Sequence, residues 1–185
     1  MMNLETAPED LNGSDLILTQ DNDKFAVYNA KNELLSNKVS KIILVNFCMQ
    51  KEPYEYDDFM IMELKEDIVL NEFSYPACIT NNTNYQKVNT VIRATAYGHN
   101  SWEITNNSDN GTYALRNGVF KITGDFRDGR GFLIDKYDKN TAIRPGDSGG
   151  SVIHYVNGQY YVIGVPSAIW DDTRAGVITS VPEST

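Results

Sequence analysis

The chain has 185 residues, of which 41% are hydrophobic and 22% are charged, and this composition excludes a disordered or fibrous protein. Its 25 acidic residues outnumber 16 basic ones and give a net charge of −9, so nucleic acid is not an expected partner. No apolar run reaches the roughly 18 residues that a membrane-spanning helix needs, so no membrane association is expected. The chain contains two histidines, His99 and His154, and residues 1–98 contain none.

Ten short apolar or alternating segments predict β-strands. In chain order they are residues 15–20, 24–28, 41–47, 59–64, 91–97, 112–123, 131–135, 151–156, 159–165 and 176–181. Clusters of Asn, Asp, Gly and Pro separate many of them and predict turns. Residues 29–37 are the one segment that allows a short helix of one or two turns. Short strands split by turn residues predict an all-β sandwich or barrel.

Several features indicate an extracellular protein, although the first residues lack the basic and apolar regions of a secretory signal. Four Asn-x-Ser/Thr sequences are typical of a secreted glycoprotein, and their candidate glycosylation sites are Asn12, Asn81, Asn106 and Asn110. Cys48 and Cys78 form an even pair, which is compatible with one disulfide bond or with two buried free thiols.

The most specific signal for chemistry is the run Gly146-Asp147-Ser148-Gly149-Gly150. A nucleophilic serine must project from a tight turn, so that its own amide and that of Gly146 can point at one developing oxyanion. Glycine permits positive φ and close approach of a substrate backbone. Asp147 is placed to anchor the turn through a buried charge pair. The alternative is a glycine-rich β-turn with a solvated Asp-Ser pair.

A second candidate is Asp58, which leads directly into an apolar segment. A buried carboxylate at the start of a strand could hold a catalytic histidine in one tautomer. The alternative is a solvated acidic turn before a strand. Asp58 and Ser148 are 90 residues apart, which matches the separation of roughly 90 residues in proteases with the order His, Asp, Ser.

These residues resemble the chymotrypsin/trypsin family of serine proteases, and the resemblance covers most of residues 40–182. It rests on the segments 58–64, 76–78, 96–98, 146–151, 164–169 and 175–179. It implies two six-stranded antiparallel Greek-key barrels: an incomplete first barrel in residues 1–75 and a second barrel in residues 76–185 that carries the nucleophile. It also implies a monomer that acts on a protein or peptide substrate without a metal or other cofactor.

The resemblance assigns roles to individual residues. Ser148 would be the nucleophile, and the amides of Gly146 and Ser148 would form the oxyanion hole. Asp58 would orient the histidine. Asp147 would pair with an N-terminal amine that activating cleavage releases.

The specificity pocket would be formed by Ala142, Ser167 and Gly176. Ala142 would lie at its base without a charge, and Gly176 on its wall would leave room for a large side chain. The resemblance therefore implies a preference for apolar or aromatic residues rather than for Lys or Arg.

The chain departs from the family at the catalytic base. The histidine should fall roughly 45 residues before Asp58, near residue 13, where the sequence reads Leu-Asn-Gly-Ser-Asp. His99 and His154 are expected to be ordinary loop and strand residues. One interpretation is a serine endopeptidase truncated at its N-terminus. Another is a secreted non-catalytic homologue that binds a protein partner, and a third is an unrelated β-sandwich adhesion module.

Overall fold

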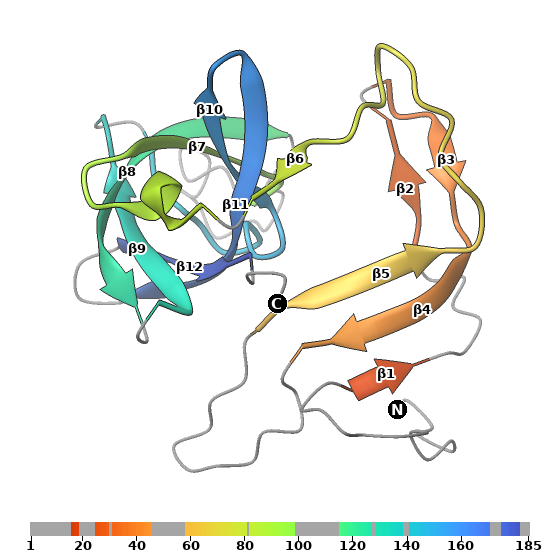
Figure 1. The fold of residues 1–185 in the computed structure, drawn as a ribbon, viewed down its shortest axis with the longest axis horizontal. Coiled ribbons are helices and arrows are strands. Elements are labelled where there is room, and N and C mark those ends of the chain that lie inside the picture. Colours follow the sequence, from red (N-terminus) through yellow and green to blue (C-terminus); the bar gives the residue numbers. More distant parts are fainter. Residues whose placement is uncertain are drawn as a thin grey trace, which may run out of the picture. The chain divides into compact units, whose positions relative to one another are not determined.

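The computed structural model describes residues 16–18, 25–29, 31–45, 58–80, 82–98, 115–126, 129–138, 141–170 and 175–181. The chain divides into two compact units, Met1–Pro76 and Ala77–Thr185 (Figure 1). In the described residues every regular element is a β-strand, apart from one 3-10 helix, so the predicted all-β class is confirmed. Across these ranges no helix is long and apolar enough to cross a membrane.

The first unit contains two separate small sheets. β1 (Leu16–Leu18), β4 (Val39–Leu44) and β5 (Met60–Leu64) form an antiparallel sheet in the order β1-β4-β5. β2 (Val27–Tyr28) and β3 (Leu34–Ser36) form an antiparallel pair of their own. No pairing among the described residues joins these two sheets, so the first unit shows no closed barrel there.

β3 occupies a segment for which the sequence allowed helical turns. The side-chain oxygen of Asn29 accepts hydrogen bonds from the amides of Lys31 and Glu33, both at 2.9 Å. Asn32 adopts a φ of 62°, a left-handed conformation that asparagine tolerates better than most residues. This side-chain-supported turn connects two strands, so the helical alternative for residues 29–37 is wrong.

The second unit is a closed antiparallel barrel of six strands. They are β7 (Val91–Ala96), β8 (Arg116–Phe126), β9 (Gly131–Lys136), β10 (Ser151–Val156), β11 (Gln159–Trp170) and β12 (Ala175–Ser180). Neighbours follow the order β10-β7-β8-β9-β12-β11, and a further pairing of β10 with β11 closes the ring. β6 (Cys78–Ile79) runs parallel to the edge of β11 and is followed by the 3-10 helix η1 (Thr83–Gln86). The six-stranded barrel expected for a trypsin-like second half is therefore present.

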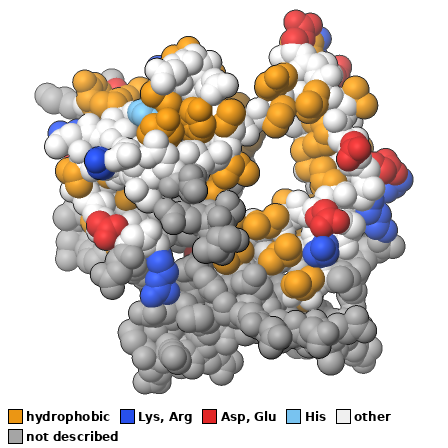
Figure 2. All heavy atoms as spheres, viewed as in Figure 1, with side chains coloured by type: hydrophobic (Ala, Val, Ile, Leu, Met, Phe, Trp, Pro, Cys, Tyr) orange, Lys and Arg blue, Asp and Glu red, His pale blue; other side chains and the backbone are white. Residues whose placement is uncertain are grey.

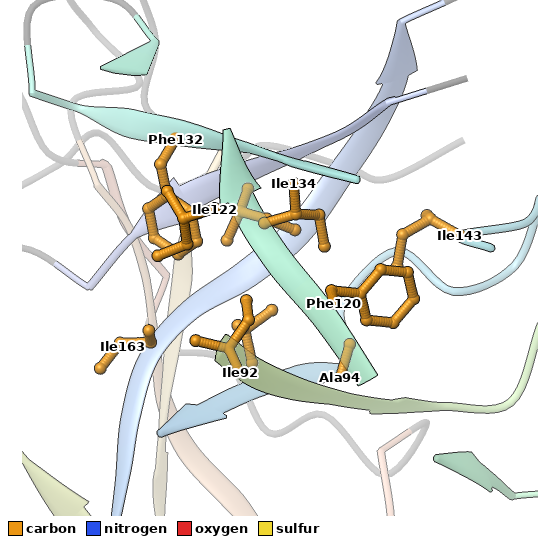
Figure 3. Close-up of a cluster of buried hydrophobic side chains, with 10 residues drawn as sticks. Ile92, Ala94, Phe120, Ile122, Phe132, Ile134, Ile143 and Ile163 are labelled. Atoms are coloured by element: carbon orange, nitrogen blue, oxygen red, sulfur yellow. The ribbon is translucent and has the colours of Figure 1, made fainter. Parts of the chain in front are cut away.

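The barrel is filled by branched and aromatic side chains (Figure 3). The cluster comprises Ile92, Ala94, Phe120, Ile122, Phe132, Ile134, Ile143, Val152, Ile163 and Ile178. Burying each large side chain contributes about 1.5–3 kcal/mol. Ile143 belongs to no strand and lies beside Phe120 in this cluster, so the core extends directly to the segment that precedes the candidate nucleophile.

Candidate active site

The candidate nucleophile lies in the segment 144–150, called here the Ser148 turn. The amide of Asp147 donates to the carbonyl of Arg144 at 3.0 Å, and the amide of Gly150 donates to the carbonyl of Asp147 at 3.0 Å. These two bonds form consecutive tight turns immediately before β10. Asp147 is shared by the two turns, and Ser148 lies in the second one and is exposed.

Glycine is required at each of three positions of the turn for a physical reason. Gly146 and Gly149 have φ values of 87° and 80°, which residues with a Cβ atom rarely adopt. Gly150 lies close against β7, because a Cβ atom there would lie 2.6 Å from the Cβ of Ala96 and 2.6 Å from the carbonyl oxygen of Thr95. The turn therefore requires glycine twice for conformation and once for space.

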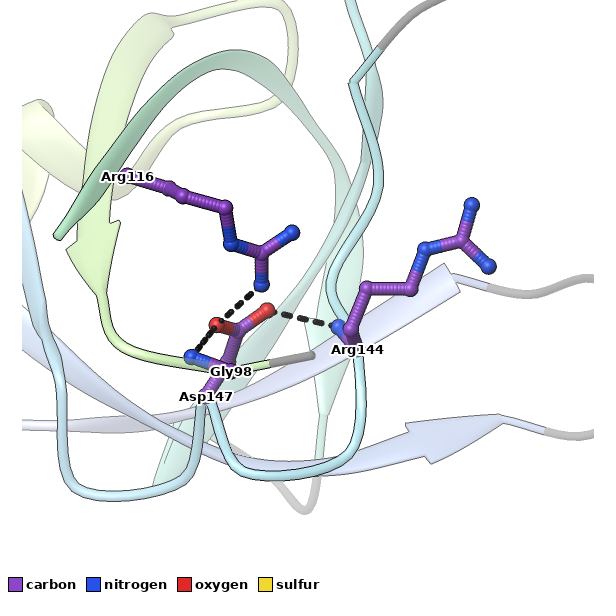
Figure 4. A network of polar contacts seen from close by, with 4 residues as sticks. All are labelled: Gly98, Arg116, Arg144 and Asp147. Carbon is purple, nitrogen blue, oxygen red and sulfur yellow. Dashed lines mark hydrogen bonds and ion pairs between the residues drawn. The ribbon is translucent and has the colours of Figure 1, made fainter. Parts of the chain in front are cut away.

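Asp147 is buried beneath the turn and is held by three donors (Figure 4). Its Oδ1 accepts from the amide of Gly98 and from Nη2 of Arg116, each at 2.8 Å, and its Oδ2 accepts from the amide of Arg144 at 2.7 Å. The guanidinium group of Arg144 points away from the carboxylate. The resemblance implied an N-terminal amine as the partner of Asp147, whereas in this structure the cation is the side chain of Arg116.

Gly98 leaves no room for a side chain next to this carboxylate. A Cβ atom on Gly98 would lie 2.6 Å from Cγ of Asp147. We therefore expect Gly98→Ala to displace the Asp147 carboxylate and to lower the thermal unfolding midpoint clearly. Gly124→Ala is the matched control, since its nearest neighbour would be Cδ1 of Leu133 at an ordinary 3.7 Å. Equal midpoints for the two variants in a calorimetric melt would contradict this prediction.

The turn is attached to β11 at an irregular point of that strand. The hydroxyl of Ser148 donates to the carbonyl of Ser167 at 3.1 Å, and the amide of Gly149 donates to the carbonyl of Pro166 at 3.0 Å. The pairing of β11 with β12 shifts register between Pro166 and Ala168, at the residues whose carbonyls accept from the turn. The structure therefore brings together Ser148 and Ser167, two residues that the sequence selected.

The two amides proposed for an oxyanion hole have no hydrogen-bond acceptor among the described residues. Gly146 and Ser148 are both exposed, and within the described ranges neither backbone N–H donates a hydrogen bond. Exposed, unpaired amides on a rigid turn can stabilise a developing negative charge.

Gly176, one of the residues predicted for the specificity pocket, packs against core side chains. Ala142 and Ser167 are half-buried and Gly176 is buried on β12. A Cβ atom on Gly176 would lie 2.8 Å from Cγ1 of Ile143 and 2.9 Å from Cγ1 of Ile134, so core side chains take the space beside it. The assignment of Ala142, Ser167 and Gly176 to a specificity pocket, and the preference for large apolar side chains, stay a prediction. The sequence did not predict that Ile143 packs beside Gly176, because it shows only that Ile143 follows Ala142.

Asp58 lies in the first unit, separated from β5 by Phe59, and it is exposed rather than buried. β5 is an edge strand, and its large hydrophobic residues Met60, Ile61 and Met62 are also exposed. Figure 2 shows hydrophobic side chains on the surface of this unit. Since Ser148 belongs to the second unit, the joint action of Asp58 and Ser148 stays a prediction.

His154 behaves as a strand residue. It lies on β10, with Nδ1 3.3 Å from the carbonyl of Val91 and its ring centroid 5.2 Å from that of Tyr85. His99 lies outside the described residues. The same holds for the four candidate glycosylation sites, Asn12, Asn81, Asn106 and Asn110.

The candidate disulfide bond is not present in this structure. Cys78 lies on β6, half-buried opposite Tyr161 of β11, and its thiol is free. Its candidate partner Cys48 lies outside the described residues. The parallel pairing of β6 with β11, and not a covalent bond, holds this segment to the barrel. Among the residues that the structure describes, no group of three His, Cys, Asp or Glu side chains could hold a metal ion.

A family model described as the Nematode trypsin-6-like family matches residues 17–175. The matched range contains Asp58, the whole Ser148 turn and the cation Arg116. No curated protein matches the chain.

Proposed function

Because the chain belongs to the Nematode trypsin-6-like family, we propose that it carries the nucleophile site of a trypsin-like serine endopeptidase, which would cleave peptide bonds through an acyl-enzyme on Ser148 once a base is supplied. One observation carries this proposal: the exposed residue Ser148 lies on a turn where the amides of Gly146 and Ser148 donate no hydrogen bond to any described residue. The buried carboxylate of Asp147 supports that turn from below. This arrangement fits acyl transfer better than it fits a solvated loop.

In the proposed reaction Oγ of Ser148 attacks the carbonyl carbon of the scissile bond. The negative charge that develops on the carbonyl oxygen is taken up by the amides of Gly146 and Ser148, and each such donor stabilises the transition state by about 3–4 kcal/mol. The attacking hydroxyl must lose its proton. Its present acceptor, the carbonyl of Ser167, cannot take the proton up, so the reaction requires a base such as imidazole.

The base is the part of the mechanism that the chain does not supply. Residues 1–98 contain no histidine, and Asp58 would act only by orienting one. Removing the base from such a site costs several orders of magnitude in rate. We therefore expect these 185 residues by themselves to have negligible protease activity.

A second candidate is a non-catalytic homologue that binds a protein partner without cutting it. The bond from Ser148 to the Ser167 carbonyl favours it, because this bond occupies the hydroxyl without activating it. The four glycosylation sequences suit an extracellular setting for either function.

Fluorophosphonate labelling in the presence and absence of free imidazole tests the proposal. Imidazole can act as the missing base, so labelling of the chain should be negligible without it and should rise with its concentration. Ser148→Ala should abolish the labelling, whereas the control Ser151→Ala, at the start of β10, should retain it. A lack of Ser148-dependent labelling at every imidazole concentration would exclude the endopeptidase and favour the binding homologue.

A further inference from the structure

The register of two barrel strands places a cation beside Asp147. Arg116 is the first residue of β8 and pairs directly with Ala96, the last residue of β7. Gly98 lies two residues after Ala96, and its amide donates to the same oxygen of Asp147 as Arg116 does. The ion pair is therefore built into the barrel's strand pairing and does not depend on a chain terminus.

The charges in this network are largely removed from water. The side chain of Asp147 is 5% exposed and that of Arg116 is 30% exposed, with 2.8 Å between Nη2 and Oδ1. A buried carboxylate needs a paired cation, because the desolvation cost otherwise dominates. The Nε atom of Arg116 is buried without a hydrogen-bond partner among the described residues, so the guanidinium is held in place by Asp147.

Both oxygens of Asp147 are already satisfied. Oδ1 accepts two donors and Oδ2 accepts the amide of Arg144. An incoming amine would have to displace Arg116 from a short, partly buried contact. A guanidinium also remains charged at any pH at which a protein is folded, whereas an α-amine loses its proton near pH 8.

We propose that Arg116 replaces a released N-terminal amine as the partner of Asp147 and holds the Ser148 turn in its working shape in the uncleaved chain. Arg116 is thus a positioning residue that acts through Asp147. The consequence for activity, a site that needs no activating cleavage, rests on the proposed endopeptidase function. The effect of Arg116 on the shape of the turn does not.

Hydrogen exchange of the uncleaved 185-residue chain, followed by mass spectrometry, tests this proposal without any need for catalysis. In the wild-type chain the peptide covering residues 144–150 should be protected, since the amides of Asp147, Gly149 and Gly150 are all hydrogen-bonded. Arg116→Gln should accelerate exchange in this peptide by at least about tenfold, because it leaves a buried carboxylate without its cation. Arg116→Lys should restore part of the protection.

Two further variants separate the ion pair from general damage to the fold. Arg144→Gln is the matched control: it removes an arginine whose side chain points away from Asp147, and it should leave the exchange unchanged. The double variant Arg116→Gln/Asp147→Asn should exchange more slowly than Arg116→Gln, because the unpaired charge is gone. Peptides from β12 report whether each variant is folded.

The proposal is overturned if the wild-type turn is unprotected, or if Arg116→Gln exchanges like the wild type. It is also overturned if neither Arg116→Lys nor the double variant recovers protection. These outcomes are independent of fluorophosphonate labelling, so failure of the proposed endopeptidase function would be recognised separately.

Discussion

Replacing Phe132 with alanine is expected to lower the free energy of unfolding of the barrel unit by about 3–5 kcal/mol. Phe132 is 2% exposed on β9, and its Cζ lies 3.1 Å from the position that a Cβ atom on Gly164 would take. The ring therefore packs closely against the backbone of β11 at Gly164, beside Ile178. Its removal loses apolar burial and creates a cavity that the closed barrel can only partly collapse around.

Urea denaturation followed by tyrosine and tryptophan fluorescence measures this loss. Tyr137→Ala is the control, since Tyr137 is an aromatic residue that is 61% exposed just beyond the same strand. It should change the free energy of unfolding by about 0.5 kcal/mol or less. Similar losses for Phe132→Ala and Tyr137→Ala would show that the barrel core is not organised as described.

Replacing Asp147 with asparagine is expected to have the second largest effect. The amide would retain one acceptor for Gly98 but would place an NH₂ group where Oδ2 accepts from Arg144, and Arg116 would lose its counter-charge. Breaking such a pair costs about 3–5 kcal/mol when both charges are fully buried. Since Arg116 remains 30% exposed, we expect a loss of about 2–3 kcal/mol.

The same variant should also abolish imidazole-dependent labelling of Ser148, because the turn would no longer hold its two amides together. Asp135→Asn is the control: this aspartate is exposed on β9, and among the described residues its side chain accepts from the neighbouring amide of Lys136 alone. It should match the wild type in both urea denaturation and labelling. If Asp147→Asn also matches the wild type, the network of Figure 4 does not stabilise the turn.

Most of the strands could be predicted from the sequence because strand signals are local. The alternation along β7 puts Ile92 and Ala94 inside and Val91 and Arg93 outside, and this period of two is visible in the residues themselves. The hairpin at residues 29–37 was not predicted, because its turn depends on hydrogen bonds to the side chain of Asn29. Asparagine side chains accept such bonds in many kinds of loop, so the residue does not identify a hairpin.

The candidate site was only partly predictable. The glycines and the serine of residues 146–150 predict a tight turn. A positive φ and a close approach between two backbone segments each require glycine. Ile143 gave no such signal, because an isoleucine beside Ala142 can point to solvent, to a pocket or to the core. Packing decided that it fills the space next to Gly176.

Length, composition and local residue chemistry by themselves determined an all-β chain, a glycine-rich serine turn and the lack of a histidine before residue 99. Only the tertiary structure decided what supports that turn. Arg116 and Asp147 are 31 residues apart, and nothing near either one identifies the other as its partner. Their contact depends on the register of β7 with β8, which pairs Arg116 with Ala96. Strand register follows from how the whole barrel closes around its core, and a local sequence pattern does not contain that information.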